Sequence, residues 1–443
     1  MEDRITRLSR LGGLAGAVII VAAACTSGAA SPSAGTSAGA SGAAPSEAPV
    51  SLAPGGTGEV TVIGTWGGAE QEAFLAMVKP WEEETGWTVK FTGTRDLNAV
   101  LTTGVASGIL PDLAGLPGPG QMAEFAQAGA LLPLNDVIDM TTYTAETAPA
   151  FVDLGTVDGQ LYGVFIKSAV KGLIWYNPKD YTAGAPATFD ALAATAPAPA
   201  ESLWCVGLES GAASGWPATD WIEDIVIRQS GPDVYDAWVA GTQKWTSPEI
   251  KSAFETFGQV LQNTYGGANT VLTTNFENAG NPLFTDPPGC LLHHQASFIT
   301  AAFKDKGGAA DGDFDFFVMP DINSQFTGSL TGAGDLFGMF HDTEEAKSLI
   351  SYLVTPEAQQ IWVDIGGAIS GNTKVTEYPD DVSKRLAETL ASAQNFRFDA
   401  SDLMPEAMNN AFWSAMLEYT QNPGNLDSIL ANLDSVQESA YGG

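Results

Sequence analysis

The chain has 443 residues, with 19 Lys and Arg against 52 Asp and Glu, so its formal net charge at pH 7 is -33. A phosphate backbone requires a basic protein face, so this charge excludes nucleic acid as a natural partner. It also argues against broad contact with an anionic lipid surface.

The first 58 residues read as an export signal followed by a tether. Three arginines precede a short apolar run at residues 11–24, which ends in three alanines before Cys25. We interpret residues 1–24 as a signal peptide. The cysteine after small residues resembles a bacterial lipoprotein signal, in which Cys25 becomes the acylated first residue; the alternative is ordinary secretion. Residues 25–58 are almost wholly Gly, Ala, Ser, Thr and Pro, which predicts a flexible tether.

Strands and helices are predicted to alternate from residue 59 to residue 129. Strand patterns occupy 59–66, 87–94 and 109–117, and helical patterns occupy 69–86, 96–107 and 119–129. This spacing predicts a parallel sheet covered on both faces, whose ligands gather at the carboxyl ends of the strands. Trp66, Arg95, Asp96 and the turn at 116–121 lie at those ends.

The remaining length exceeds one ordinary domain, so we expect two lobes. Two strand-like runs lie within 159–181, and further strands are predicted within 289–299, 314–322 and 332–340. Helices are predicted at 217–229, 248–262, 343–353 and 356–365, and from 405 to the end.

The segment "SGWPATDWIEDIV", residues 214–226, contains two tryptophans with different expected roles. Trp221 shares one helical face with Ile222 and Ile225, which predicts a core position. Trp216 precedes the predicted helix in a loop rich in Gly, Ala and Ser, where an aromatic ring has less reason to be core. Asp220 is interpreted as a helix cap or as a ligand contact.

The cysteine count favours one disulfide. If lipidation uses Cys25, Cys205 and Cys290 remain in an exported chain, where disulfides persist; the alternative is two separate buried thiols. No metal site is expected, because adjacent His293 and His294 point to opposite faces of a strand. The acidic run "DGDFDFF" lacks the glycine and glutamate of a calcium loop, so we interpret it as a turn entering a strand.

The order of several segments carries a family resemblance that covers nearly everything after the tether. These segments are "VTVIGTWGGAEQEAFLAMVKPWEEETGWTVKF", "GILPDLAGLPGPGQMAEFAQAGALLPL", "LYGVFIKSAVKGLIWYNP", "GSLTGAGDLFGMF", "TPEAQQIW" and "MPEAMNNAFWSAM". Together they resemble the extracellular solute-binding proteins of carbohydrate ABC importers. Within that group the chain is most similar to the alpha-glucoside-binding branch and more distantly similar to the maltose-binding protein.

The resemblance implies an α/β, two-lobe periplasmic-binding-protein fold of type II-like architecture. Each lobe is a sheet flanked by helices, hinge strands join the lobes, and the ligand lies in the interlobe cleft. Lobe 1 is expected to comprise 59–168 and 323–367, and lobe 2 to comprise 169–322 and 368–443. The chain is expected to cross between lobes near 168–173, 315–322 and 367–372.

The resemblance also implies the partners. The ligand is a carbohydrate, and the closed lobes are recognised by the permease subunits of the importer. We expect a monomer without a cofactor, attached to the outer face of the cytoplasmic membrane through Cys25.

Candidate sugar contacts follow from the resemblance and from the chemistry of the side chains. Arg95 and Asp96 suit vicinal hydroxyls because each makes paired hydrogen bonds; the alternative is a surface ion pair. Gln121 follows "PGPG", which replaces an expected aromatic residue. Trp413 is a contact or, with Met408, Phe412 and Met416, part of the core. The full set of expected contacts is Trp66, Arg95, Asp96, Gln121, Lys167, Lys171, Glu209, Ser210, Trp216, Asp220, Gln295, Asp335, Asn372 and Trp413.

Two alternative functions remain open at this stage. A secreted glycoside hydrolase also lines its cleft with acids and tryptophans, and a binding protein of this kind can take a solute that is not a sugar. The order and spacing of the quoted segments favour binding without catalysis, so no catalytic residue is expected. The sequence does not identify the sugar.

Overall fold

The computed structural model describes residues 52–195 and 202–442. The predicted signal peptide, Cys25 and residues 26–51 of the tether lie outside the described residues. No helix within the described ranges combines the length and the apolar character that crossing a bilayer requires.

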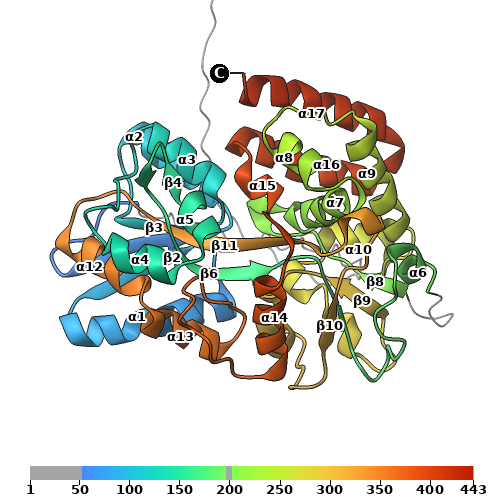
Figure 1. The fold of residues 1–443 in the computed structure, drawn as a ribbon, viewed down its shortest axis with the longest axis horizontal. Coiled ribbons are helices and arrows are strands. Elements are labelled where there is room, and N and C mark those ends of the chain that lie inside the picture. The colour runs from blue at the N-terminus through green and yellow to red at the C-terminus, as the bar shows by residue number, and fades with distance from the viewer. Residues whose placement is uncertain (1–51, 196–201, 443) are drawn as a thin grey trace, which may run out of the picture. The chain divides into compact units, whose positions relative to one another are not determined.

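The described residues form two α/β lobes, and the larger sheet belongs to the first of them (Figure 1). β1 pairs in parallel with both β2 and β3, as the alternation of strands and helices predicts. β11 is antiparallel to β3 and β6 and parallel to β12. The strands of this sheet are β1 (Glu59–Gly64), β2 (Thr88–Gly93), β3 (Leu113–Leu116), β6 (Val164–Val170), β11 (Ser329–Met339) and β12 (Asn395–Phe398).

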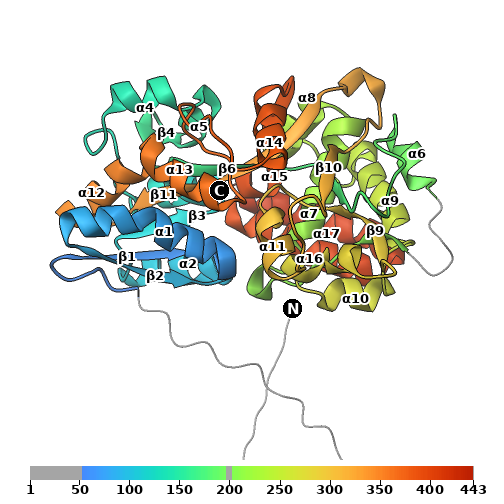
Figure 2. The same cartoon turned by 90° about the horizontal axis from the view of Figure 1, so that it is seen from below.

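Helices cover both faces of the larger sheet. Figure 1 shows α2 and α3 above β3 and β11, and α1 and α13 below them. Figure 2, seen from below, shows α1 next to α12 and α13. A two-stranded ribbon, β4 (Thr156–Val157) and β5 (Gln160–Leu161), precedes β6. The helices of this lobe are α1 (Gly68–Thr85), α2 (Leu97–Ser107), α3 (Pro119–Gln127), α4 (Met140–Glu146), α5 (Pro149–Leu154), α12 (Glu344–Leu353) and α13 (Pro356–Ile365).

The smaller sheet has the strand order β10-β7-β9-β8. Its strands are β7 (Leu173–Tyr176), β8 (Ser202–Cys205), β9 (Cys290–His294) and β10 (Asp315–Val318). Cys205 and Cys290 form a disulfide between β8 and β9, with their Cα atoms 5.5 Å apart. The remaining helices are α6 (Phe189–Ala193), α7 (Trp216–Gln229), α8 (Pro232–Val239), α9 (Pro248–Leu261), α10 (Gly267–Thr273), α11 (Ile299–Asp305), α14 (Asp381–Ala391), α15 (Ala400–Leu403), α16 (Glu406–Gln421) and α17 (Leu426–Ala440).

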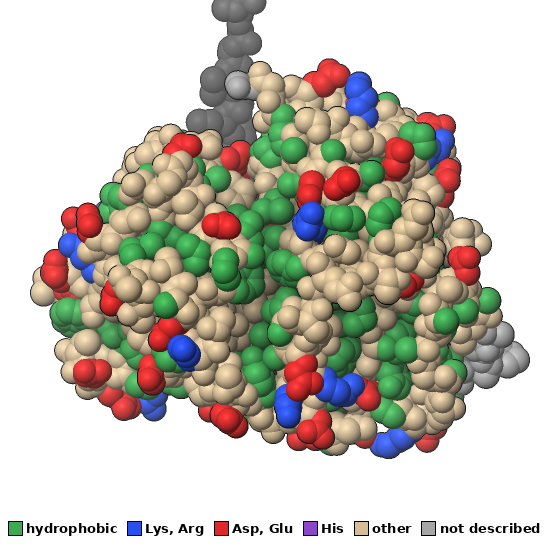
Figure 3. Space-filling view, in the orientation of Figure 1, with side chains coloured by type: hydrophobic (Ala, Val, Ile, Leu, Met, Phe, Trp, Pro, Cys, Tyr) green, Lys and Arg blue, Asp and Glu red, His purple; other side chains and the backbone are tan. Residues whose placement is uncertain are grey.

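Each sheet has its own hydrophobic core. Trp66, Phe74 and Trp362 belong to a cluster against the larger sheet. Trp221 and Phe412 belong to a second cluster between α7, α9 and α16, so the predicted core position of Trp221 is confirmed. Separate cores of this kind are the basis of a two-lobe architecture. Figure 3 shows a furrow with many apolar side chains between the two lobes on this face, and more acidic than basic groups elsewhere on it.

The structure differs from the sequence-based elements at several places, and it adds helices and strands that were not predicted, among them α4, α5, α6, α8, α10, α11 and β8. α7 begins at Trp216, so this ring belongs to the first turn of the helix and not to the preceding loop. The last helical stretch is broken by a 3-10 turn at Pro423–Asn425, where proline and glycine interrupt the helix. α14 and β12 were not predicted. β12 lies in the range predicted for lobe 2 and pairs with the start of β11, and the lobe boundaries stay a prediction.

Gly172 joins the two sheets, because it connects β6 directly to β7. Its φ is +69°, and a Cβ atom there would lie 2.6 Å from both Arg228 Nη2 and Asp224 Oδ1. Those two side chains form a buried ion pair that is also bonded to Thr331 in β11 and to His294 in β9. A side chain at 172 would therefore disturb the network that packs α7 against both sheets.

We expect Gly172→Ala to destabilise the protein by about 2–4 kcal/mol, because backbone strain and overpacking add together. Gly184→Ala is the matched control, since Gly184 has a φ of +72° but no atom near its potential Cβ. The control should lose only about 1 kcal/mol. Urea unfolding measures both values. Equal losses would mean that the contact with the ion pair contributes nothing.

Candidate functional site

A cavity of ≈ 130 Å³ lies between the two lobes. The exit of β1, the first turns of α1 and α2, and residues 167–169 of β6 supply its lobe 1 side. α7, α16 and the segment after β12 supply the opposite side. The lining residues with charged or aromatic side chains are Trp66, Glu70, Arg95, Lys167, Lys171, Trp216, Asp220, Phe276, Phe298, Asp335, Asp399, Asp402 and Trp413.

Lys167 organises the lobe 1 side of the cavity. It is buried on β6, and its Nζ lies 2.5 Å from Glu70 Oε1 and 3.0 Å from Asp335 Oδ2. The ammonium also lies 4.8 Å from the ring centroid of Trp362 and 5.6 Å from that of Trp66. Burial opposes the charge on Lys167, but Asp335 and Glu70 outweigh it and raise the pKa of this lysine to about 12.

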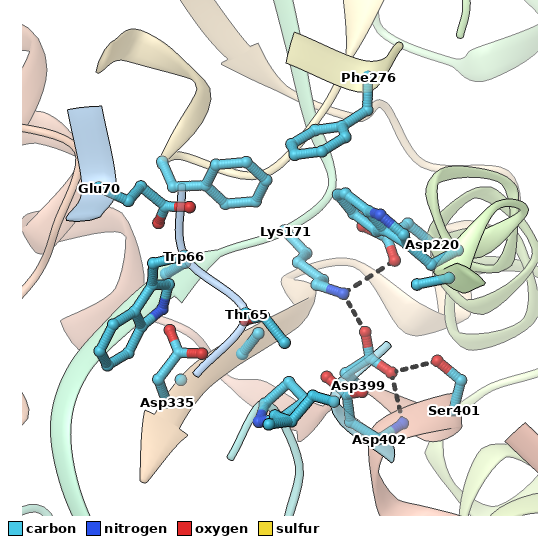
Figure 4. A pocket seen from close by; sticks show the side chains of 18 of the residues that line it. Thr65, Trp66, Glu70, Lys171, Asp220, Phe276, Asp335, Asp399, Ser401 and Asp402 are labelled. Carbon is cyan, nitrogen blue, oxygen red and sulfur yellow. Dashed lines mark hydrogen bonds and ion pairs between the residues drawn. The ribbon is translucent and has the colours of Figure 1, made fainter. Parts of the chain in front are cut away.

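Lys171 plays the same part on the opposite side, directly after β6. Its Nζ pairs with Asp220 Oδ1 at 2.8 Å and with Asp399 Oδ2. Figure 4 shows this ammonium between the two carboxylates, with Trp66 and Asp335 across the cavity. Burial opposes the positive charge of Lys171, but the surrounding carboxylates raise its pKa well above the ordinary value.

Asp399 holds the segment after β12 in place through its second carboxylate oxygen. Asp399 Oδ1 accepts hydrogen bonds from Ser401 Oγ at 2.7 Å and from the backbone N–H of Asp402 at 2.8 Å. Asp399 is therefore the N-cap of the short helix α15 as well as a partner of Lys171. This double role brings the Asp402 side chain to the cavity wall.

The region around Lys171 has more carboxylates than cations, and burying the excess negative charge costs free energy. Burial raises the pKa of Asp220 to about 7 in spite of Lys171, and it raises the pKa of Glu223 and Asp402 well above the ordinary range. Asp220 Oδ2 is buried and has no hydrogen-bond partner within the described residues. It is therefore an acceptor that a ligand hydroxyl can use.

Three of these acids, Asp220, Glu223 and Asp399, have carboxylate oxygens within 4.8 Å of one another. Such a group can hold a cation, and here the cation is the Lys171 ammonium. The Glu223 oxygens accept from the backbone N–H groups of Ala400 and Ser401. The three acids therefore already have partners: backbone N–H groups for Glu223 and the Lys171 ammonium for Asp220 and Asp399.

Aromatic rings form the other part of the wall. Trp216 lies edge-on to Phe276, with ring centroids 5.1 Å apart, and 6.0 Å from the Phe298 centroid. Trp216 and Trp413 are half-buried, whereas Trp66 is 2% exposed and packs on Phe91 and Trp362. A half-buried indole beside carboxylates suits a ligand that has an apolar face and a rim of hydroxyls.

Eight of the fourteen expected contacts line this cavity. They come from six regions far apart in the sequence, and they are Trp66, Arg95, Lys167, Lys171, Trp216, Asp220, Asp335 and Trp413. The two lysines contact carboxylates, so they hold acids in place for a ligand. Trp413 is half-buried at the cavity and is not enclosed with Phe412 and Met416.

Two of the alternatives considered for these residues are wrong. Asp220 is not a helix cap: α7 starts at Trp216 after Gly215, which places Asp220 in the second turn, facing Lys171. Arg95 and Asp96 do not form a surface ion pair. Asp96 is exposed at the start of α2, while Arg95 turns away from it toward Ser210 and the Thr65 carbonyl.

The structure places six expected contacts outside the cavity lining. Glu209 accepts from Asn275 Nδ2, Ser210 accepts from Arg95, and Gln295 accepts from the N–H of Ala296. Asn372 is buried and donates to Glu146 and to the Val354 carbonyl. Asp96 and Gln121 are the other two.

Gln121 is buried in α3 and does not line the cavity, because the α15 segment packs closely on the start of this helix. A Cβ on Gly118 would lie 2.4 Å from the Asp402 carbonyl oxygen, and one on Gly120 would lie 2.4 Å from that of Met404. The glycines of "PGPG" therefore let the α15 segment pack directly on the start of α3. That segment supplies Asp402 to the cavity, whereas Gln121 stays buried in α3.

Sequence reasoning missed Glu70, Phe276, Phe298, Asp399 and Asp402. Asp399 had one usable signal, since "DASD" places an acid three residues before another acid, ahead of Pro405, as helix starts often do. That signal predicts a helix start, but it does not predict that Asp399 pairs with Lys171. The two phenylalanines carry no local signal at all.

Known proteins match this chain over most of its length. The model of the family described as bacterial extracellular solute-binding protein matches residues 76–389. The chain is 38% identical over 373 residues to the osmoprotective compounds-binding protein GgtB of Synechocystis sp., covering 82% of this chain and 88% of GgtB. It is 35% identical over 390 residues to the alpha-glucosides-binding periplasmic protein AglE of Rhizobium meliloti, covering 83% and 84% of the two chains.

Solved structures show the same fold at low sequence identity. The bacterial solute receptor AcbH matches with a TM-score of 0.76 at 19% identity, over 87% of this chain and 100% of that chain. A chitin oligosaccharide binding protein matches with a TM-score of 0.76 at 22% identity, over 87% and 99%. From the family match and the two relatives, the chain belongs to the bacterial extracellular solute-binding proteins.

Proposed function

We propose that this protein is the extracellular substrate-binding component of an ABC sugar importer. It captures a carbohydrate, an alpha-glucoside or small oligosaccharide, by closure of its two lobes and delivers it to the membrane permease. It carries out no reaction on the sugar.

The single observation that carries this proposal is the combination of half-buried indoles and anchored carboxylates in one interlobe cavity. A pyranose ring has C–H groups on its faces and hydroxyls around its edge. Trp216 and Trp413 offer surfaces for the faces, while Asp220, Asp335 and Asp402 offer acceptors for the hydroxyls. Lys167 holds Asp335, and Lys171 holds Asp220, in position before the ligand arrives, which lowers the entropic cost of binding.

The relatives support the choice of sugar class. AglE is named for binding alpha-glucosides and GgtB for binding osmoprotective compounds, and each covers more than four fifths of this chain. Uncharged small polyols satisfy both descriptions. An acidic cavity also suits an uncharged ligand, because its lysines are already neutralised by carboxylates.

The delivery role implies attachment and motion. We propose that Cys25 carries the acyl anchor, that the chain stays at the outer face of the cytoplasmic membrane as a monomer, and that residues 25–58 act as the tether. Residues 59–168 with 323–367 form one moving body, and residues 169–322 with 368–443 form the other. Closure biased by a ligand between two such bodies is a hinge motion.

Titration of the full-length chain with maltose, trehalose, sucrose, palatinose and maltotriose tests the proposal. We expect a saturable change in tryptophan fluorescence at micromolar sugar, because Trp216 and Trp413 lie at the cavity. The bound sugar should be recovered intact. If no sugar of the panel changes the fluorescence, the alpha-glucoside assignment is rejected. If any sugar is cleaved, the protein is a hydrolase and not a receptor.

We expect Lys171→Met to abolish sugar binding and to destabilise the protein by about 3–5 kcal/mol, because Asp220 and Asp399 lose their buried counter-charge. The loss should be smaller at about pH 5 than at about pH 8. The pKa of Asp220 is already about 7 and rises further without Lys171, so the folded state binds protons below neutral pH that the unfolded state does not.

Lys374→Met is the matched control, since Lys374 is exposed and has no ion pair within residues 52–195 and 202–442. Thermal and urea unfolding at both pH values measure the difference. A loss that is equal at both pH values, or no larger than that of the control, would contradict the role given to Lys171.

A further inference from the structure

Arg95 connects the two lobes across the cavity. Its Nη1 donates to the Thr65 carbonyl at 3.1 Å, on its own lobe, and its Nε donates to Ser210 Oγ at 3.0 Å, on the other. The guanidinium also lies 5.2 Å from the ring centroid of Phe276. Within the described residues no carboxylate forms an ion pair with it, although the chain has a large excess of acids.

The loop that receives Arg95 is shaped around it. Gly211 follows Ser210 with a φ of +59°, and a Cβ atom there would lie 3.3 Å from Arg95 Cβ. Glu209 anchors the same loop by accepting from the Gly211 N–H and from Asn275 Nδ2. Moving the arginine aside therefore costs two hydrogen bonds and a close packing contact.

A second pocket, of ≈ 290 Å³, begins on the far side of Arg95. Arg95, Asn98 and Trp413 line both this outer pocket and the inner cavity. Half of the other residues that line the outer pocket have polar side chains, and they are Asp96, Ser214, Asn410 and Ser414. The Arg95 side chain, held by its hydrogen bond to Ser210, therefore forms a partition between the inner cavity and the outer pocket. Both spaces are lined by groups that can form hydrogen bonds with a ligand.

The size of the inner cavity limits what fits on its side of the partition. Its volume is ≈ 130 Å³, against ≈ 290 Å³ for the outer pocket, so the smaller of the two spaces lies on the inner side of Arg95. A saccharide chain that extends from the inner cavity into the outer pocket has to run through the position of the Arg95 side chain. The outer pocket would offer that chain more room and new hydroxyl partners, including Asp96.

We propose that Arg95, positioned by Ser210, determines the length of the ligand: it restricts the receptor to short glucosides and keeps longer saccharide chains out of the outer pocket. This inference rests on the proposed function, since it concerns the sugar bound at the same site. It also gives the Arg95–Ser210 pair a role other than direct contact with the sugar.

Calorimetric titration of the full-length protein with two series of sugars tests the partition. One series is maltose, maltotriose and maltotetraose, and the other is sucrose, raffinose and stachyose; the series whose disaccharide binds is the informative one. In the wild type we expect affinity to fall with each added ring. In Arg95→Ala the affinity for the four-ring sugar relative to the disaccharide should rise about tenfold.

Two further variants separate the roles. Ser210→Ala keeps the bulk of the arginine but removes its hydrogen bond across the cleft, so we expect a smaller rise in the same ratio. Lys374→Ala removes an exposed lysine outside both pockets and should leave the ratio unchanged. Retained disaccharide binding shows that each variant is folded, and Arg95→Lys replaces Arg95→Ala if the latter does not bind.

The outcomes are distinguishable. A wild type that binds long and short sugars equally, or an Arg95→Ala ratio equal to that of the wild type, overturns the length limit but leaves the receptor function intact. A wild type that binds no sugar in either series overturns the proposed function, and the length limit with it.

Discussion

The cleft depends on one costly arrangement, which is the burial of two ammonium groups at and just beyond β6, the strand that leads from the larger sheet to the smaller. Each ammonium requires opposite charge, and the fold supplies two carboxylates to each. Those acids come from α1 and β11 for Lys167, and from α7 and the N-cap of α15 for Lys171. Because the two ammonium groups need these four carboxylates, four segments that are distant in the sequence meet at one place, and that place is the cavity.

The charge balance of these groups also shapes the chemistry of the cavity. A carboxylate that pairs with a lysine through one oxygen still has its other oxygen, such as Asp220 Oδ2. That oxygen can accept a hydrogen bond from a ligand in a fixed orientation. A carboxylate that is held by an ammonium keeps its orientation without a ligand, whereas a free acid on a flexible chain does not. The aromatic rings opposite then supply contact area without competing for the same hydrogen bonds.

Small residues decide how closely the two lobes approach at the edges of the cavity. Gly118 and Gly120 let the Asp402–Met404 backbone lie on α3, and Gly211 lets Arg95 reach the second lobe. A Cβ atom at each of those positions would come closer to a neighbouring atom than ordinary van der Waals contact allows. The shape of the site is thus set as much by missing Cβ atoms as by the groups that touch the ligand.

Local patterns in the sequence were sufficient for most elements and for part of the site. The periodicity around Trp221 identified a core helix, and the alternation after residue 59 identified the parallel strands, because both patterns depend on neighbours within a few residues. Trp66 and Arg95 were found because each follows the end of a strand, where cleft residues gather, whereas Lys167, Trp216 and Asp335 came from the family resemblance.

Residues whose role depends on a distant partner could not be found in this way. Asp220 was interpreted as a helix cap or a ligand contact before Lys171 was placed beside it, and Asp399 was not singled out, because its pairing appears only where the chain returns past β11. By itself the sequence determined an acidic chain of alternating strands and helices, because composition and periodicity are local properties, and the order of its segments carried the resemblance that implied a two-lobe binding protein. Only the tertiary structure decided which acids meet which lysines and that Arg95 crosses the cleft to Ser210, because those contacts join segments separated by 49 to 228 residues.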